Sequence, residues 1–343
     1  MKKLVATLLS VALLLLSVTG CNNAQQTDAV PDGDSPFEKI NIKLSYSGTD
    51  LGMDGLVAAK FAELVAEATD NRVTVDCYGN AQLASGSMQR LLELLIQGGA
   101  FEIAILSDGV LDAANPQFFA PALPFVFKDY ADVYDHVDAP KGQEWLKKNF
   151  DEMGLVYLAT FSNGISQITN NKREVFVPDD LKGLKMRVYG ETDFKLMSAL
   201  GADAINMSWS EVYSAMQQGA IDGHINGLQT ISSANIQEVQ KYITMVNMTW
   251  SGYHVCIGNK DWGKFSEPLQ QVLKEKAVEA AIYGRQLLDQ QESELRTKFE
   301  QNGNVFCDVT DEQLQQWKAL THPVSKDIIA KLSEETCEVW DLK

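Results

Sequence analysis

The sequence predicts an α/β protein with two lobes and a central cleft between them. Alternating strand and helix patterns run from residue 40 to residue 106, and the same alternation starts again at residue 155. Such alternation is typical of parallel strands joined by helical crossovers. A third observation is the stretch 267–302, which contains a single glycine and whose amphipathic spacing predicts one or two long helices that brace both lobes.

The first block contains three expected strands and two expected helices. Residues 40–46 alternate apolar and polar side chains, as a strand with one buried face does. Residues 56–68 carry apolar pairs at helical spacing, and residues 88–96 form a second helical pattern that stops at a Gly-Gly pair. Further strands are expected at residues 73–78 and 101–106.

The second block repeats this order after one expected turn. Strands at 155–161 and 166–169 flank Asn163-Gly164, a pair typical of turns. The remaining elements are a strand at 185–189, a helix at 192–200, a strand at 204–207, a helix at 210–218 and a strand at 221–226. The expected lobes are residues 37–162 plus 252–291 (lobe I) and residues 163–251 plus 292–343 (lobe II).

The N-terminal residues are expected to export and tether the protein. Two lysines precede an apolar run over residues 4–18, which at about 15 residues is too short to cross a bilayer and fits a signal peptide over residues 1–21. The run ends in Val18-Thr19-Gly20-Cys21, which resembles the bacterial lipobox, so that acylation of Cys21 and a lipid anchor on the outer side of the cell membrane are expected. Residues 22–36 lack hydrophobic periodicity and are expected to form a flexible tether.

The chain is acidic, which restricts its partners. Its formal net charge is −17 and becomes −19 without the two lysines of the expected signal peptide, so a nucleic-acid partner is not expected. An anionic ligand would need a local cation. The cysteines after residue 21 fit no metal-binding spacing, and the sequence leaves open whether any of them pair: Cys77, Cys256, Cys307 and Cys337.

The sequence contains no familiar catalytic motif, so no catalytic residue, metal or cofactor is expected. It lacks the G-x-S-x-G elbow, the H-E-x-x-H pair and the Walker A loop. The four histidines are scattered, and nothing in the sequence places Ser, His and Asp in a triad. The protein is expected to bind a ligand and not to be an enzyme.

Three residues of the second block suit a binding site. Arg187 lies within an apolar strand, where it faces either an exposed edge or a cleft, and its guanidinium offers two parallel donors to a carboxylate. Trp209 lies at a strand–helix tip, where α/β proteins form ligand sites, although a core position suits it equally well. Asn226 ends the strand 221–226 and lies at the next tip.

At these residues the chain resembles the DctP-type solute-binding proteins of tripartite ATP-independent periplasmic (TRAP) transporters. The resemblance extends over nearly the whole chain after residue 36, and its segments stand in the family's order. They are residues 78–83, 105–109, 123–127, 180–188, 209–213 and 222–226. The resemblance implies a two-lobed fold like that of class II periplasmic binding proteins, with a cleft that closes on the ligand and a long helix that spans both lobes.

The resemblance also implies roles for single residues. Arg187 is expected to pair with a ligand carboxylate, Asn226 to bind the ligand, and Trp209 to pack against it. The first lobe is expected to contribute further ligand contacts, which carry over less directly: Tyr46, Gln82 and Asp108. The implied partners are a small organic acid and the small and large membrane subunits of the transporter. A binding lipoprotein of an ABC importer or of a sensor kinase is the alternative.

Two positions depart from the family pattern. Ser166, also expected in the site, stands where many members have a second arginine, and Ile225 stands where relatives often have Glu. Both changes reduce the expected polarity of the cleft, and Trp209 in place of the usual Phe enlarges its aromatic wall. We therefore expect a monocarboxylate with an apolar or aromatic body, or a ligand held partly by neutral hydrogen bonds, rather than a dicarboxylate or a highly hydroxylated sugar acid.

Overall fold

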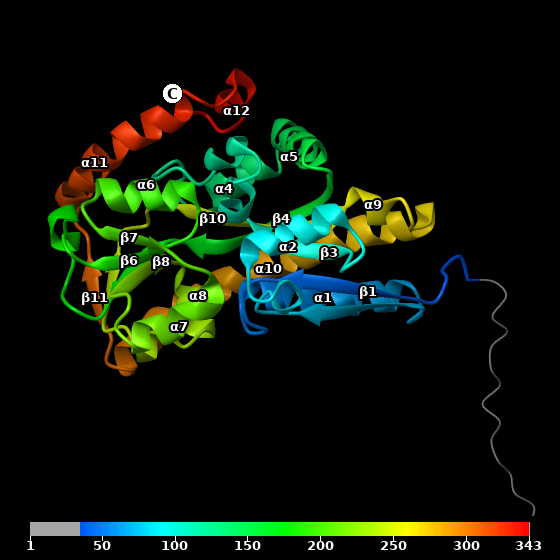
Figure 1. Ribbon diagram of the computed structural model, residues 1–343, viewed down its shortest axis with the longest axis horizontal. Coiled ribbons are helices and arrows are strands. Elements are labelled where there is room, and N and C mark those ends of the chain that lie inside the picture. The colour runs from blue at the N-terminus through cyan, green and yellow to red at the C-terminus, as the bar shows by residue number, and fades with distance from the viewer. Residues whose placement is uncertain (1–34, 343) are drawn as a thin grey trace, which may run out of the picture. The chain divides into compact units, whose positions relative to one another are not determined.

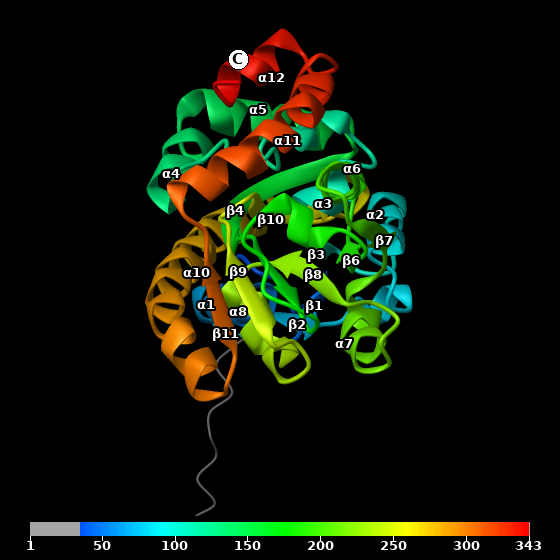
Figure 2. The same ribbon diagram turned by 90° about the vertical axis from the view of Figure 1, so that its left-hand side faces the viewer.

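Two sheets organise the chain into two lobes (Figures 1 and 2). The structure is a computed structural model that describes residues 35–342, so the expected signal peptide and Cys21 lie outside the described residues. Lobe I is built on a five-stranded sheet of order β2-β1-β3-β10-β4, and lobe II on a six-stranded sheet of order β11-β9-β5-β8-β6-β7. Within the described part of the chain, no helix has the length and apolar character needed to cross a bilayer.

The sheet of lobe I is mixed. β1 pairs in parallel with β2 and β3, as the alternation of strands and helices predicts, whereas β10 joins later and runs antiparallel between β3 and β4. The period of two in β1 places Ile42 and Leu44 in the core, where both are fully buried. The strands are β1 (Ile40–Tyr46), β2 (Val73–Tyr78), β3 (Ile103–Ser107), β4 (Leu155–Ile165) and β10 (Trp250–Gly258).

Helices cover both faces of this sheet. α1 and the long α10 share one apolar core with β1, and α2 and α5 share the other core with β10. α1 and α10 approach each other closely at Gly284, since a Cβ built there would lie 2.4 Å from Val57 Cγ2. The helices of lobe I are α1 (Met53–Ala68), α2 (Met88–Gln97), α3 (Asp108–Leu111), α4 (Tyr130–Val137), α5 (Pro140–Glu152) and α9 (Asn259–Trp262).

Lobe II repeats the mixed pattern. β6 pairs in parallel with β7 and β8, whereas β5 runs antiparallel between β8 and β9. The strands are β5 (Gln167–Asn170), β6 (Lys185–Val188), β7 (Asp203–Asn206), β8 (Gly223–Asn226), β9 (Tyr242–Met245) and β11 (Val305–Asp308). Its helices are α6 (Glu191–Ala199), α7 (Trp209–Gln217) and α8 (Leu228–Ser233). Short 3-10 turns lie at Gln82–Ala84, Pro116–Phe119, Pro178–Leu181 and Ile236–Glu238.

The expected turn at Asn163-Gly164 is wrong. β4 continues through both residues to Ile165, because β10 pairs with it along its whole length and holds the backbone extended. The glycine absorbs an irregularity there: Gly164 has φ +122, and the register between the two strands shifts between Ser251 and Gly252. The chain therefore passes directly from β4 of lobe I to β5 of lobe II through Ser166.

The stretch predicted to form one or two long helices is a single helix, α10 (Glu267–Gln301). Its 35 residues correspond to about 52 Å. Leu273 near its start belongs to the core of lobe I, and Phe299 near its end belongs to a core of lobe II. The helix thus spans both lobes, as expected.

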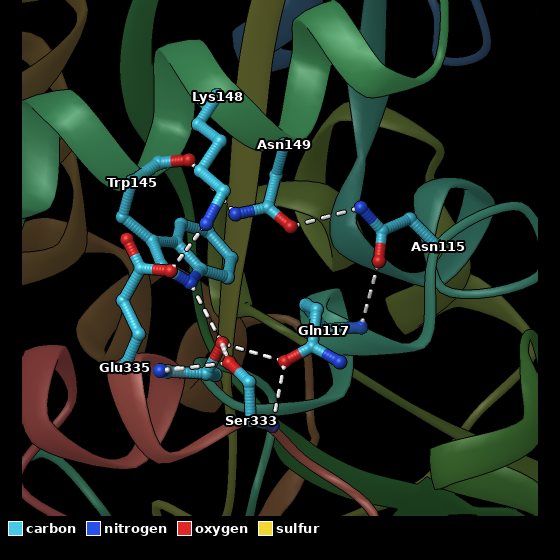
Figure 3. A network of polar contacts seen from close by, with 8 residues as sticks. Asn115, Gln117, Trp145, Lys148, Asn149, Ser333 and Glu335 are labelled. Atoms are coloured by element: carbon cyan, nitrogen blue, oxygen red, sulfur yellow. Dashed lines mark hydrogen bonds and ion pairs between the residues drawn. The ribbon is translucent and has the colours of Figure 1, made fainter.

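The C-terminal segment returns to lobe I. α11 (Asp311–Ile329) begins in lobe II, where Trp317 is fully buried, and the chain then reaches α12 (Glu334–Val339) beside α5 (Figure 1). Trp145 of α5 donates a hydrogen bond of 2.9 Å from Nε1 to Thr336 Oγ1, and its ring contacts that of Trp340 edge-on at 5.2 Å. Figure 3 shows this junction, in which Lys148 also pairs with Glu335 at 2.5 Å. The expected lobe II includes residues 292–343, whereas the last of them pack on α5 of lobe I through aromatic contacts between residues distant in sequence.

The four cysteines within residues 35–342 form no disulfide. Cys256 and Cys307 are buried, and Cys77 and Cys337 are partly buried. They lie in different elements of the two lobes, from β2 to α12. We treat them as core thiols.

Candidate ligand-binding cleft

A cavity of about 850 Å³, open mouth included, lies between the lobes. Lobe I lines it with the loop after β1 and with α3, and lobe II with the carboxyl ends of β6 and β8 and the first turns of α6 and α7. Ligand sites of α/β proteins occupy this position at strand ends. Four of the residues predicted from the sequence line the cavity: Ser166, Arg187, Trp209 and Asn226.

Arg187 is a buried cation with a donor to spare. Its side chain is only 4% exposed, and its Nε donates to the backbone oxygen of Met207 at 2.9 Å. Its Nη2 is buried and has no hydrogen-bond partner among the described residues. Burial lowers the pKa of Arg187 to about 10, so the guanidinium stays charged at neutral pH. A buried charged donor without a partner is costly, and an anion in the cleft would relieve that cost.

Aromatic rings hold the guanidinium in place. It lies 5.5 Å from the ring centre of Trp209 and 5.6 Å from that of Tyr189, the residue that follows β6. His224 of β8 stacks on Trp209 at 5.9 Å, and burial lowers its pKa to about 3, so that it is neutral. Trp209 therefore stands between a neutral ring in the lobe and the cation in the cleft. It is half-buried, lines the cavity and also packs against a hydrophobic core in each lobe.

Asn226 is held by its carbonyl end. Its Oδ1 accepts from the side chain of Asn163 at 3.3 Å and from the backbone N–H of Gly227 at 3.0 Å. Asn163 in turn accepts from Thr230 Oγ1 at 2.7 Å. This arrangement leaves the Asn226 amide N–H groups as donors for a ligand, because they make no hydrogen bond within the described residues.

Ser166 lies at the crossing between the lobes. Its backbone bonds to Thr249 and Met248 at 2.8 and 3.1 Å, and its side chain is 6% exposed. Ile225, the other position that departs from the family pattern, also lines the cavity. Both residues lie where the sequence analysis expects a less polar surface.

The residues predicted from the first lobe do not line the cavity. Tyr46 is 2% exposed and donates to Asp50 at 2.6 Å within lobe I, and Gln82 is exposed on a 3-10 turn. Asp108 is 2% exposed and accepts from the Gly252 backbone at 2.6 Å, while His254 Nε2 lies 2.9 Å from its other oxygen. None of the three lines the cavity in this structure, and their ligand contacts stay untested predictions. Sequence neighbours of Tyr46 and Asp108 line the cavity instead: Ser47, Ser107 and Gly109.

Asp108 belongs to a buried line of polar groups. Thr160 Oγ1 lies 2.8 Å from His254 Nδ1, and His254 Nε2 faces Asp108. The order hydroxyl, imidazole, carboxylate is that of a catalytic triad. Here the hydroxyl belongs to a residue only 1% exposed in the core of lobe I and accepts from Tyr157 at 3.0 Å. The line joins α3 to β10 and β4, and so positions the lobe I wall of the cleft.

Sequence reasoning missed the acidic side of the cleft. Asp54, Asp112 and Asp193 all line it, and Arg187 is the only basic residue among the described lining residues. Burial raises the pKa of each carboxyl, to about 7 for Asp54, about 8 for Asp112 and about 6 for Asp193. These aspartates lie at helix termini, which no strand pattern marks as facing a cleft.

Side chains at the rim connect the lobes. Gln229 of lobe II donates to the backbone oxygen of Leu51 at 2.9 Å, Thr49 donates to that of Ser233 at 3.4 Å, and Ser210 donates to that of Gly86 at 3.3 Å. The lobes therefore contact each other on both sides of the cavity, and the structure represents a closed arrangement. No cluster of residues suited to hold a metal ion occurs within residues 35–342.

The chain matches one family of known proteins. The model of bacterial extracellular solute-binding proteins, family 7 (DctP), matches residues 45–332. The C4-dicarboxylate-binding periplasmic protein of Rhodobacter capsulatus is 29% identical over 303 residues, which are 87% of this chain and 89% of that protein. An uncharacterised protein of Sinorhizobium fredii is 35% identical over 245 residues, or 71% of this chain, but the chain spans only 44% of that protein's length.

Solved structures share the fold. The sugar acid binding protein of Advenella mimigardefordensis, in complex with galactonate, superposes with a TM-score of 0.84 at 27% identity, over 89% of this chain and 97% of that one. A TRAP periplasmic solute-binding protein of Sulfurospirillum deleyianum, with bound succinate, superposes with a TM-score of 0.82 at 26% identity, over 89% of this chain and 99% of that one. Both are two-lobed binding proteins, as the sequence predicts for this chain.

Proposed function

The chain belongs to family 7 of the bacterial extracellular solute-binding proteins, and we propose that it serves a TRAP-type secondary transporter as its solute-binding lipoprotein. In this role it captures a small organic acid outside the cytoplasm and delivers it to the membrane subunits. The names of its relatives support an organic acid, because they include a C4-dicarboxylate binder and proteins holding galactonate and succinate. Transport proteins of this kind bind their solute without converting it.

The observation that carries the proposal is the unpartnered donor of Arg187. A guanidinium that is buried in a closed cleft, with Nη2 free and Nε fixed on Met207, is ready to bind a carboxylate. The acidic chain makes this local cation necessary, since its net charge of −17 repels anions at long range. Asn226 and Trp209 complete the proposed site as an amide donor and an aromatic wall.

Replacing Arg187 with Ala tests the proposed site. Thermal-shift screening of residues 22–343 against butyrate, γ-aminobutyrate, succinate and galactonate would identify a binder, because a ligand at about 100 times its Kd stabilises by about 2.7 kcal/mol. Arg187→Ala should then weaken binding by about 10- to 150-fold, the equivalent of about 1.5–3 kcal/mol for a lost charge-assisted bond. Lys185→Ala, which removes an exposed cation from the same strand, is the matched control. An unchanged affinity in Arg187→Ala removes Arg187 from the site.

The proposed lipid anchor rests on the lipobox-like segment that ends at Cys21. Cys21→Ser should release the protein from the membrane fraction and abolish labelling by a fatty-acid probe in cells. If the variant stays membrane-bound and labelled, the anchor lies elsewhere.

The alternatives of an ABC importer or a sensor kinase are distinguished by neighbouring genes: a small and a large membrane subunit without an ATPase support the TRAP assignment.

A further inference from the structure

The three carboxyls of the cleft are not equivalent. Asp54 already has two partners, because it accepts from the backbone N–H groups of Gly48 at 2.6 Å and Gly55 at 3.1 Å. A Cβ at Gly48 would lie 2.3 Å from its Oδ1, so the loop after β1 is folded tightly around this carboxyl. Asp54 is thus explained as a structural residue of lobe I.

Asp193 and Asp112 face each other across the cleft from different lobes. Asp193, in the first turn of α6, is half-buried and interacts electrostatically with Arg187. Asp112 ends α3 in lobe I, and the backbone N–H of Thr192 in lobe II acts on its carboxyl to lower the pKa. The negative charges that act on Asp112 come from Asp193, Asp108 and Glu191. Glu191 pairs with Lys195, and Arg187 lowers the pKa of Asp193, but no basic side chain of the described residues pairs with Asp112 itself.

Asp112 retains an unused acceptor. It is 3% exposed and lines the cavity, yet its Oδ1 has no hydrogen-bond partner among the described residues. Thr192 shows the same pattern: it is 3% exposed, it lines the cavity, and its Oγ1 has no partner. Buried acceptors without donors are rare in folded proteins, and a ligand donor at this point would satisfy them.

From this arrangement we infer that the ligand is a zwitterion, with a carboxylate at Arg187 and a positively charged N–H donor at the oxygen atoms of Asp112 and Thr192. The inference rests on the proposed function, because it uses Arg187 as the carboxylate anchor. The aromatic rings of the lining, Tyr189, Trp250 and Tyr253 among them, offer further favourable surfaces to a cation. This ligand differs from the apolar monocarboxylate expected from the sequence, since that expectation did not include the acidic wall.

A second carboxylate fits the same point less well. Arg187 is the only basic residue among the described lining residues, so the second carboxylate of a dicarboxylate would face Asp112 and Asp193 without a cation. Burial and these neighbours raise the pKa of Asp112 to about 8, and an ammonium group beside it would lower that pKa again. A dicarboxylate binds here only if Asp112 is protonated and donates a hydrogen bond to the second carboxylate. Its binding would then respond differently from that of an ammonium ligand to substitution of Asp112.

A series of ligands that differ in one terminal group tests the inference. Calorimetric titration with γ-aminobutyrate, γ-hydroxybutyrate, butyrate and succinate, together with their homologues one and two methylenes longer, compares an ammonium, a hydroxyl, a methyl and a carboxylate. At the chain length that fits the cleft best, the ligand with the ammonium group should bind at least about tenfold more tightly than the hydroxyl, methyl and carboxylate ligands, as a charge-assisted bond predicts. Tighter binding of the hydroxyl, methyl or carboxylate member overturns the inference.

The variant Asp112→Asn separates the two roles of Asp112. It keeps the size and an acceptor oxygen but removes the charge, so it should weaken binding of the ammonium member about tenfold and leave butyrate unchanged. Asp203→Asn, which neutralises an exposed aspartate at the start of β7, is the control for net charge. Equal affinities in Asp112→Asn and the wild type overturn the inference.

Arg187→Ala shows which proposal has failed. If an acid binds in an Arg187-dependent way but no ammonium carboxylate does, the zwitterion is wrong and the proposed function stands. If binding of every acid is independent of Arg187, both are wrong. Loss of ammonium-ligand binding in both Arg187→Ala and Asp112→Asn supports both.

Discussion

The two lobes build their sides of the cleft by different means. Lobe II presents Arg187 and Asn226 from the carboxyl ends of neighbouring strands, with Trp209 at the start of the helix that follows β7. Lobe I presents a loop folded around Asp54 and the end of the four-residue helix α3, which Asp108 holds to β10. Strand ends are positions that a sequence pattern can locate, whereas the lobe I wall exists only when distant segments are assembled. The proposed carboxylate anchor and aromatic wall thus come from strand ends and a helix start of lobe II, whereas lobe I contributes Asp112 on a wall that Asp108 supports.

Asp108 offers the largest expected effect and the sharpest test of that separation. Asp108→Asn removes the charge from two buried hydrogen bonds, and we expect unfolding to require about 3 kcal/mol less free energy, with ligand affinity of the folded protein little changed. Urea unfolding followed by fluorescence measures the effect, with the exposed Asp76→Asn in the same sheet as control. A variant of normal stability that no longer binds would make Asp108 a ligand contact and erase the contrast between the lobes.

Trp209 should show the opposite pattern on the lobe II side. Trp209→Ala removes the ring that holds the Arg187 guanidinium at 5.5 Å, and we expect a loss of about 1–2 kcal/mol in binding, or about 5- to 30-fold in Kd, with a smaller loss of stability. Trp209→Phe should keep most of the affinity. If Trp209→Ala lowers the melting temperature but not the affinity, Trp209 is a core residue and not part of the cleft wall.

Glu292 lies between the lobes and gives the smallest expected effect. It accepts from Tyr130 at 2.8 Å, and Tyr130 accepts from the backbone of Ile165 at the end of β4. Burial raises the pKa of Glu292 from 4.5 to about 7, so the folded protein favours the protonated form. Its stabilising contribution is complete below about pH 4.5 and is lost as the pH rises to about 7.

Glu292→Gln isolates this contribution, because Gln keeps an acceptor for Tyr130 and does not titrate. The urea midpoint of the wild type should fall relative to that of Glu292→Gln between pH 5 and pH 8. Unfolding curves measured at steps of about one pH unit resolve this difference. Tyr130→Phe removes a hydrogen bond that lowers the pKa of Glu292, so the pH dependence should persist in this variant. Parallel pH profiles for the wild type and Glu292→Gln would show that Glu292 ionises freely and has no special role at the crossing.

Most of the fold was predictable because local patterns agreed with the final structure. The period of two predicted β1, and the strand expected at 73–78 has the observed bounds of β2; the stretch 267–302, expected as one or two helices, matches α10 within one residue. The turn at Asn163-Gly164 failed because β10, almost ninety residues later in the chain, pairs with these residues and keeps them extended. The expected placement of α12 in lobe II differs from the structure for the same reason, because its aromatic partners on α5 are distant in sequence.

The site was predictable only in part. Arg187, Asn226, Trp209 and Ser166 line the cavity, and their ligand contacts remain predictions. Asp112 and Asp193 were missed because an acidic residue near a helix end is common on exposed surfaces, and only the meeting of the two lobes brings both into one cavity lining. The chemistry of the acidic wall is therefore a property of the assembled protein.

The order of the strands in lobe I also bears on how the protein is made. β10 lies between β3 and β4 although it is synthesised after nearly all of lobe II, and α12 covers α5 only at the end of the chain. A polypeptide emerges from a ribosome or a translocation channel with its N-terminus first. The sheet of lobe I is therefore complete only after β10 has emerged up to residue 258, and α12 can pack on α5 only after residue 339 has emerged. The sheet of lobe I is thus discontinuous in sequence, and its inner strand β10 becomes available only after β5 to β9 of lobe II have been synthesised.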